Sequence, residues 1–221
     1  YIVYDESNKT LDFTGVSLNT GSFTLNTDFT LNDANSGYYD GWNLLANPYP
    51  SYYDAEQITF NGDVHKCVYM FTGSNYEYYL PSGGSTAGHD PVSLGSSITR
   101  YIPPMQGFMV KAHGTGASVS LANGGRVHAS EPLYKAGKPS NPSNALALRI
   151  SSQNHSDALV VRLANAATRS FDGNMDAYKM APYNPDIPQL YSLGNGVHYA
   201  INSLPWSVPN LPLGIKTGKS G

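Results

Sequence analysis

The best-spaced candidate metal ligands lie in one short segment, FDGNMDA. Asp172, Asn174 and Asp176 occupy alternate positions there, and oxygen ligands with this spacing begin a calcium-binding loop. Such a loop also needs glycine at its sixth position and glutamate at its twelfth, where this chain has Ala177 and Tyr183. Alternatively, Asp172 and Asn174 cap a turn and Asp176 begins a strand. The segment therefore predicts either a structural Ca²⁺ site or a capped turn, and the chain predicts no other cofactor.

Motifs for catalysis are missing from the sequence. The six histidines stand singly, without an H-E-x-x-H motif, and Cys67 is the only cysteine, so neither a zinc site nor a disulfide framework is indicated. There is no G-x-S-x-G, and no suggestive pair of carboxylates occurs. Near the C-terminus, GIKTGKS has three residues between its glycines where a phosphate-binding loop needs four. We predict that the chain is not an enzyme and that Cys67 is a buried residue of a strand.

Tyrosines are the most abundant candidates for contact with a ligand, since the chain has 17 of them. Tyrosine rings beside turns offer flat faces for sugars or proteins at low entropic cost. The alternative is ordinary cross-strand packing in a half-buried sheet. Five tyrosines lie beside predicted turns and are our candidates for contact with a glycan or a protein: Tyr52, Tyr53, Tyr76, Tyr78 and Tyr79.

The composition predicts an all-β protein. Charged residues make up 13 % of the chain, about half the usual share, whereas glycine, proline and tyrosine are abundant. The net charge of −3, without a basic cluster, argues against a nucleic-acid partner. No apolar run approaches the ~20 residues of a transmembrane helix.

Alternating and continuous apolar runs locate the strands. Residues 22–31 alternate between apolar and polar side chains, which predicts a half-buried antiparallel strand. The run at 42–45 predicts a buried strand that ends before Pro48 and Pro50, because proline lacks an N–H and restricts the residue before it. Two hairpins are also predicted, one from strands 64–72 and 75–80 and one from strands 105–112 and 117–121.

A stretch rich in Pro, Ser, Asn and Gly at residues 131–144 predicts a linker between two domains. We expect residues 1–130 and 145–221 to form two antiparallel β-sandwiches in tandem, of the jelly-roll or immunoglobulin-like kind. The second range holds five or six predicted strands, fewer than the ~7 of an immunoglobulin-like sandwich. It is therefore either incomplete or completed by a strand from elsewhere.

Three stretches carry a family resemblance: GWNLLANPYPS at 41–51, YMFTGSNYEYY at 69–79 and YIPPMQGFMVKA at 101–112. In this order they resemble the C-terminal β-sandwich region of Bacteroidetes secreted and cell-surface proteins that are cargo of type IX secretion. The resemblance implies an extracellular or cell-surface location and a module that precedes a sorting domain. It does not imply an activity, because such modules accompany proteases, glycosidases and adhesins alike. The chain starts in mid-strand, so we expect it to be a piece of a longer protein.

The expected function is that of a non-catalytic extracellular module for adhesion, display or assembly. One alternative is a carbohydrate-binding accessory module of a polysaccharide-degrading enzyme, with the loop tyrosines and Trp206 as one exposed platform. The other is a strand-exchanging subunit of an extracellular fibre, which would self-assemble by filling the incomplete second sandwich.

Overall fold

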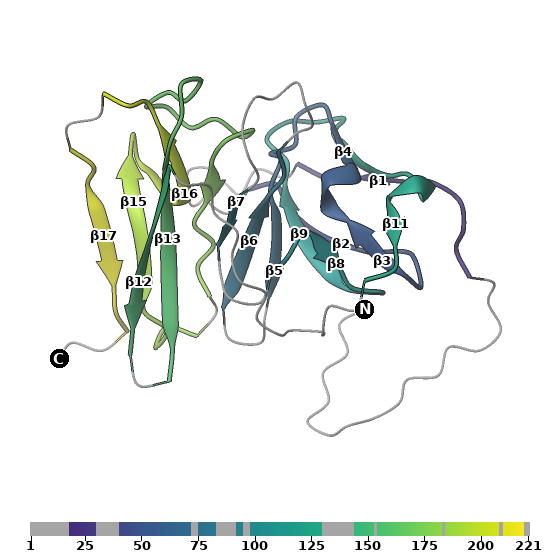
Figure 1. The fold of residues 1–221 in the computed structure, drawn as a ribbon, viewed down its shortest axis with the longest axis horizontal. Helices are drawn as coiled ribbons and strands as arrows, with labels where there is room; N and C mark the ends of the chain where they lie inside the picture. Colours follow the sequence, from purple (N-terminus) through teal and green to yellow (C-terminus); the bar gives the residue numbers. More distant parts are fainter. Residues whose placement is uncertain are drawn as a thin grey trace.

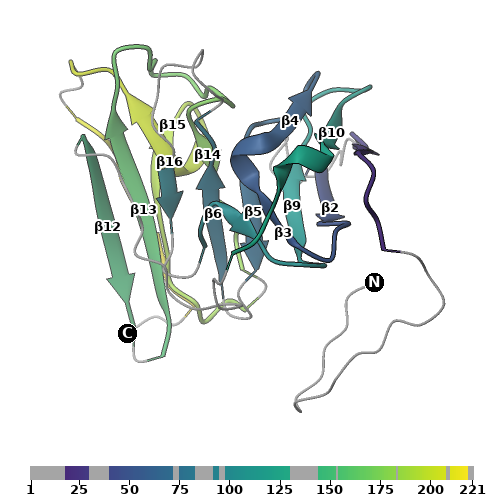
Figure 2. The ribbon, with the colours of Figure 1, turned by 45° about the vertical axis from the view of Figure 1, so that its right-hand side comes forward.

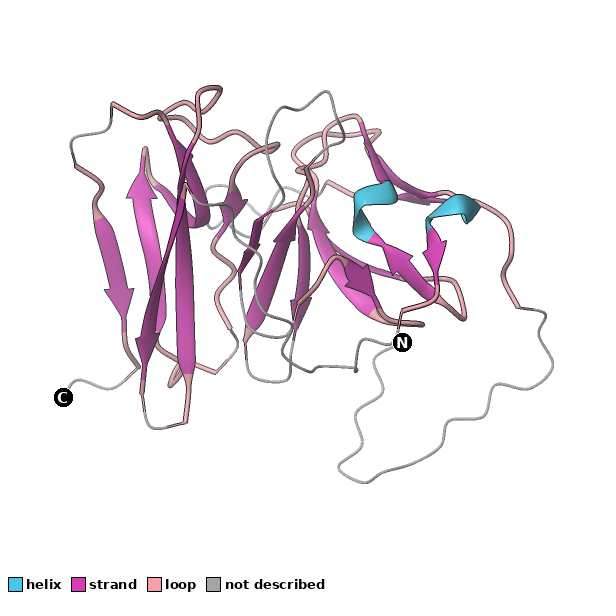
Figure 3. Ribbon diagram, viewed as in Figure 1, coloured by secondary structure: helices cyan, strands magenta, loops and turns pink. Residues whose placement is uncertain are grey.

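The computed structural model describes residues 18–29, 40–71, 75–82, 92–94, 98–129, 144–152, 154–182, 184–207 and 210–218. Over these ranges the chain is nearly all β, with several antiparallel sheets and two single-turn 3₁₀ helices, η1 (Ala55–Gln57) and η2 (Asn123–Gly125). The prediction of an all-β protein is confirmed (Figure 3). No helix in the described ranges is long and apolar enough to cross a membrane.

The described residues of the first unit form three sheets. A five-stranded sheet has the order β2 (Trp42–Ala46), β9 (Gly107–Lys111), β5 (Val68–Phe71), β6 (Tyr76–Leu80) and β7 (Val92–Leu94). A three-stranded sheet has the order β1 (Phe23–Asn26), β10 (Ser118–Leu121) and β4 (Ile58–Asn61), and another has β11 (Arg126–Val127), β3 (Tyr52–Asp54) and β8 (Tyr101–Ile102). The strand over 42–45 and the first hairpin are confirmed as β2 and as β5 paired with β6.

The prediction that strands 105–112 and 117–121 pair with each other is wrong. β9 pairs with β2 and β5, whereas β10 pairs with β1 and β4 in another sheet. The connection is held elsewhere, because Ala112 forms a bridge with Val64 and the His113 amide donates to the Asp63 carbonyl oxygen at 2.8 Å. The short segment between β9 and β10 therefore connects two sheets and does not form a hairpin turn.

The segment after β2 is organised by Asn47. The two prolines end the strand as predicted, and the buried Asn47 side-chain amide donates to the carbonyl oxygens of Ser51 (2.9 Å), Ile102 (3.1 Å) and Pro103 (2.9 Å). This amide thus joins the two proline-containing segments of the chain.

The second unit forms one six-stranded sheet from β12 (Ala145–Ser151), β13 (Ser156–Leu163), β14 (Ala177–Tyr178), β15 (Gln189–Gly194), β16 (Val197–Leu204) and β17 (Leu213–Lys216). The order is β12-β13-β16-β15-β17, with β14 beside β16, and β13 and β16 run parallel. The predicted pairing across 151–156 is confirmed by β12 and β13. Of the predicted linker the structure describes only Asn144, whose side-chain amide donates to the Leu163 carbonyl oxygen.

The two units share a hydrophobic core. One face of the five-stranded sheet packs on the first unit's other strands, and its opposite face packs on the six-stranded sheet, so that the molecule has layers side by side (Figures 1 and 2). β9 shows both faces, because Phe108 and Val110 belong to the first core and Met109 packs against the shared one. The shared core consists of Cys67, Tyr69, Tyr78, Leu80, Val160, Ala177, Ala200 and Ile201.

This shared core makes the two units one body. Each fully buried large aliphatic side chain stabilises a fold by about 1.5–3 kcal/mol, so separating the two sheets would be strongly unfavourable. Tyr78 adds polar contacts across the junction, because its hydroxyl accepts from the Met180 amide at 2.9 Å and donates to the Met180 carbonyl oxygen at 3.2 Å. Cys67 is fully buried in this core, as predicted, but it directly precedes β5 instead of lying in a strand, and burial raises the pKa of its thiol.

A buried ion pair lies beside the shared core. Lys179 Nζ is 2.5 Å from an oxygen of Asp157, and both side chains are buried. Asp157 also accepts from the Asn75 side-chain amide at 3.0 Å and from the Leu190 backbone amide at 2.7 Å. Because Asn75 precedes β6, this network joins the first unit to two strands of the second.

Candidate functional site

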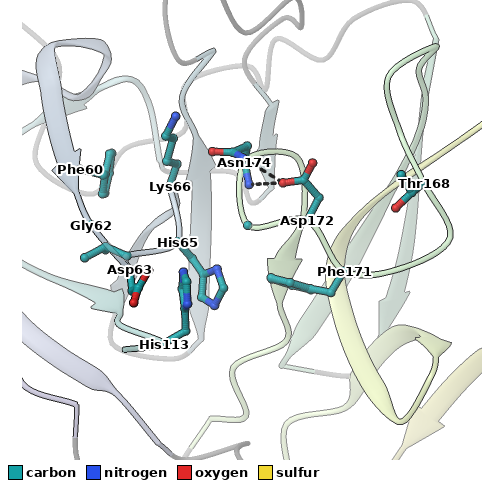
Figure 4. A pocket seen from close by; sticks show the side chains of 12 residues that line it. Phe60, Gly62, Asp63, His65, Lys66, His113, Thr168, Phe171, Asp172 and Asn174 are labelled. Carbon is teal, nitrogen blue, oxygen red and sulfur yellow. Dashed lines mark hydrogen bonds between the residues drawn. The ribbon is translucent and has the colours of Figure 1, made fainter. Parts of the chain in front are cut away.

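A pocket of about 510 Å³ opens at the junction of the two units (Figure 4). Its first wall is the connection between β4 and β5, together with the residues that follow β9. The backbone holds this wall in place, because the His65 amide donates to the Lys111 carbonyl oxygen at 2.9 Å and the Lys66 amide to the Gly173 carbonyl oxygen at 2.8 Å. The first unit contributes the side chains of Phe60, Asp63, His65, Lys66 and His113.

The second wall is a capped turn in the segment before β14, with Thr168 and Phe171 beside it. Asp172 Oδ1 accepts from the backbone amide of Asn174 at 2.9 Å and from its side-chain amide at 3.0 Å. Asp176 accepts from the backbone amides of Asp172 (2.8 Å) and Ser203 (2.7 Å). This is the capped turn that the sequence left open as the alternative to calcium. Among the described residues, no group of three or more His, Cys, Asp or Glu side chains could hold a metal ion.

Asp176 is the most deeply placed of the three predicted calcium ligands. It is buried directly before β14, and burial raises the pKa of its carboxyl to about 7, against the lowering effect of the Ser203 and Asp172 amides. Asp172 is half-buried and Asn174 is exposed at the pocket. Asp172 and Asn174 thus lie in the wall of the pocket. Asp176 is not part of the wall, and it stabilises the turn by accepting from the Asp172 amide.

His65 is the central side chain of the first wall. Its residue is only 8 % exposed, and its ring lies 4.4 Å from the ring of His113, centroid to centroid. The Phe171 ring meets it edge-on at 5.0 Å, and its Nε2 atom is buried without a hydrogen-bond partner among the described residues. Burial, His113 and Lys111 lower the pKa of His65 to about 3, so its imidazole is neutral at pH 7.

The contact between His65 and the capped turn requires glycine at position 173. A Cβ atom added to Gly173 would lie 2.0 Å from Nδ1 of the buried His65 ring. Gly173→Ala should therefore displace the ring and lower the free energy of unfolding by about 1–3 kcal/mol. Urea unfolding measures the loss, with Gly124→Ala as the control, because a Cβ there meets nothing within 4 Å. Equal stability of both variants would contradict this packing.

The lowered pKa of His65 predicts a pH dependence of stability. Between about pH 3 and pH 6.5 the unfolded chain binds a proton at His65 and the folded chain does not, so this contribution to stability falls as the pH falls. From pH 7 to pH 5 the protein should lose about 2 kcal/mol that a His65→Phe variant does not lose. Asp176 has the opposite effect, since its raised pKa removes stability as the pH rises through about 7. Asp176 is present in both proteins, so the comparison isolates His65, and parallel pH profiles would contradict the prediction.

Three further polar side chains line the pocket. Among the described residues, the side chains of Asp63, Lys66 and His113 have no hydrogen bond or ion pair. Asp63 and His113 are exposed, whereas Lys66 is half-buried. They add a carboxylate, an ammonium group and an imidazole to a scaffold whose two walls are linked by backbone hydrogen bonds.

The five predicted tyrosines lie away from this pocket. Tyr53, Tyr78 and Tyr79 are buried, and Tyr52 and Tyr76 are half-buried. Tyr79 donates its hydroxyl to Glu56 at 2.6 Å, and Tyr53 stacks on Tyr49 with ring centroids 5.6 Å apart. Three of the five rings therefore serve packing and hydrogen bonding within the described fold. An exposed platform of tyrosines with Trp206, which is 62 % exposed, does not form from them.

Sequence reasoning passed over the histidine pair because His65 and His113 lie far apart in the chain. One signal could have found it. His65 shortly precedes β5 and His113 closely follows β9, and the beginning of one antiparallel strand meets the end of its neighbour. Knowing that these two strands pair would have placed the two rings at the same edge of the sheet.

Comparison with known proteins gives one match. A family model described as "Domain of unknown function (DUF8693)" matches residues 3–221. No curated protein and no solved structure matches the chain.

Proposed function

The chain belongs to the DUF8693 family, and we propose that it is a non-catalytic extracellular binding module of a secreted or surface-anchored bacterial protein. Its role is adhesion or display, and its ligand, a glycan or a protein of the cell surface, binds in the pocket between the two units. The extracellular location rests on the resemblance of the 41–51, 69–79 and 101–112 stretches to Bacteroidetes type IX cargo.

One observation carries the proposal: both units supply walls to a single pocket, and the shared core fixes one wall against the other. Ligand sites occur preferentially at such junctions, and 510 Å³ lies within the usual range of about 300–1,000 Å³. A preformed pocket loses little entropy when it binds, which suits a module that must hold its partner without doing chemistry on it.

The described lining residues also lack a serine or cysteine nucleophile. The buried imidazole of the pocket is neutral. Thr168 is committed to a turn, since its hydroxyl donates to the Ser170 carbonyl oxygen at 3.0 Å and accepts from the Ser170 amide at 3.2 Å. The groups present can accept and donate hydrogen bonds to a bound molecule.

A glycan array followed by calorimetric titration of each hit tests the proposal. We expect saturable binding. The His113→Ala substitution should weaken it at least fivefold, because His113 lines the pocket and can bond to the ligand. Since His113 is exposed, we expect the variant to keep its fold. A substitution outside the pocket, Asn195→Gly, is the control. It relieves a positive φ of 49° in an exposed turn and should leave binding unchanged. Binding that is equal in all three proteins would place the ligand elsewhere.

Carbohydrate is the ligand class that the lining favours. Phe60 and Phe171 are half-buried rings on opposite walls, and carboxylate, amide and imidazole groups lie between them. Sugars combine an apolar C–H face with a ring of hydroxyl groups, and such a lining serves both. This composition supports the hypothesis that the chain is an accessory module of a polysaccharide-degrading enzyme, in which the sugar binds in the pocket and not on a platform of tyrosines.

A second candidate function is that of a strand-exchanging subunit of an extracellular fibre, and the edge of the six-stranded sheet supports it. β12 is a regular seven-residue edge strand without proline; its one charged residue is Arg149, and its Leu146 is 60 % exposed. Such edges invite pairing with another strand. Light scattering over a concentration series tests it: growth that Leu146→Lys abolishes would support strand exchange, and a constant monomer mass would oppose it.

A further inference from the structure

We propose that the junction pocket selects a sugar residue that carries a free, protonated amino group. The inference rests on the proposed function, since it names the ligand class of the same pocket. It follows from the charges of the lining, from the buried His65 and from the apolar Phe171.

The charges in the pocket are unbalanced. Asp63 on the first wall and Asp172 on the second wall are carboxylates, and neither has a cationic partner among the described residues. Lys66 is the one lysine among the described residues of the lining, and its side chain extends away from the two histidines (Figure 4). An ammonium group between the walls would receive charge-assisted hydrogen bonds, which are about twice as strong as neutral ones.

His65 points to a ligand by its unmet hydrogen-bonding capacity. A neutral imidazole has one donor and one acceptor nitrogen, and a buried polar atom without a partner costs about 1–3 kcal/mol. His65 Nε2 is such an atom, in a residue of the pocket wall that is more than nine-tenths buried. This nitrogen is closed to solvent, so a sugar hydroxyl reaches it only after the His65 ring has turned toward the pocket, and the hydroxyl can then either donate to it or accept from it. The neutral ring also does not repel a cationic ligand.

Phe171 supplies the apolar face and is held rigidly. Its ring stacks on Tyr178 with centroids 4.0 Å apart, forms a T-shaped contact with His65 and lies 5.7 Å from the Tyr199 ring. A fixed aromatic ring suits the C–H face of a sugar and also attracts a cation. An amino sugar presents a cation, hydroxyl groups and a C–H face within one ring.

Matched oligosaccharides test the selection by isothermal titration at pH 6.5 and low salt: the β-1,4 tetramers of glucosamine, N-acetylglucosamine and glucose. We expect the glucosamine tetramer to bind at least tenfold more tightly than the other two. Its affinity should also fall severalfold in 0.5 M NaCl, because salt screens interactions between accessible charges.

Charge-neutral variants assign the effect to the pocket. Asp63→Asn and Asp172→Asn should each weaken binding of the glucosamine tetramer about five- to tenfold and narrow its advantage over the N-acetylated one. Asp172→Asn keeps an oxygen that can accept from Asn174, so the turn is retained, and thermal melting confirms folding. Asp186→Asn, an exposed substitution outside the lining, is the matched control and should bind as the wild type does.

The outcomes separate the two proposals. Equal binding of all three tetramers would overturn the selection of an amino group and leave the glycan-binding function standing. Binding of the glucosamine tetramer that is insensitive to both pocket variants would overturn the assignment to this pocket. If none of the three tetramers binds at millimolar concentration, the selection proposed here is wrong, and the glycan array then decides on the proposed function separately.

Discussion

Asn47→Asp should lower the free energy of unfolding by about 3–5 kcal/mol, the largest effect we expect from a substitution that adds no volume. The Asn47 amide nitrogen lies within hydrogen-bond distance of three carbonyl oxygens, at 2.9 Å, 3.1 Å and 2.9 Å, in a buried site. Aspartate would place a carboxylate oxygen against those carbonyl oxygens, so that donors are lost and an uncompensated charge is buried. Urea unfolding at pH 7 measures the difference.

A neighbouring asparagine provides the control for this prediction. Asn43 also binds backbone groups, since it accepts from the Asp28 amide at 2.7 Å and donates to the Asp28 carbonyl oxygen at 2.8 Å, but it is only half-buried. Asn43→Asp keeps the acceptor and leaves the new charge near water, so a loss of about 1 kcal/mol is expected. If the two variants lose equal stability, Asn47 does not organise the proline segments.

Lys179→Met should cost about 3–5 kcal/mol, because it leaves Asp157 buried and charged without its partner. Burial lowers the pKa of Lys179, whereas Asp157 raises it, and the 2.5 Å contact keeps the ion pair together. The double variant Lys179→Met with Asp157→Asn removes both charges and retains an oxygen that can accept from the Leu190 amide. It should recover at least 1.5 kcal/mol relative to the sum of the two single losses, as a double-mutant cycle measures. Additive losses would show that the pair is not coupled.

The network around Asp157 also predicts how the two units unfold. The shared core and the Asn75 contact cross the junction, so Lys179→Met should lower the unfolding midpoint of both units together. Tryptophan fluorescence, to which Trp42 beside the shared core and Trp206 of the second unit both contribute, and far-ultraviolet circular dichroism should give one coincident transition. Two separate transitions would mean that the units are stable independently.

Local sequence patterns predicted the strands well, because the alternation of apolar residues and the positions of prolines and turn residues are local properties of the sequence. β12 and β13, the end of β2 before Pro48 and Pro50, and the β5–β6 hairpin all follow from alternation, prolines and turn residues within a few positions. What these patterns do not contain is which faces meet. β9 has apolar residues on both faces. The sequence alone does not show that Phe108 and Met109 face different cores, because this depends on where the second unit's sheet packs.

The site was the less predictable part, for the same reason. Asp172 and Asn174 were recognised by their spacing, because an aspartate that caps its own turn is a local device. The pairing of His65 with His113 depends on the register of β5 against β9, and the approach of Phe171 depends on the shared core. Burial of the tyrosines was not predictable from their position, because a tyrosine beside a turn can face inward, as Tyr78 and Tyr79 do.

The most direct test of the junction pocket as the ligand site is a nuclear magnetic resonance titration that follows the histidine ring nitrogens. The chain has six histidines, of which His65 and His113 lie in the pocket, while His155 and His198 lie elsewhere in the second unit. A glycan that binds should shift the ring signals of His65 and His113 in a saturable way and leave those of His155 and His198 in place. Saturable binding that leaves the signals of His65 and His113 unchanged would contradict the central claim.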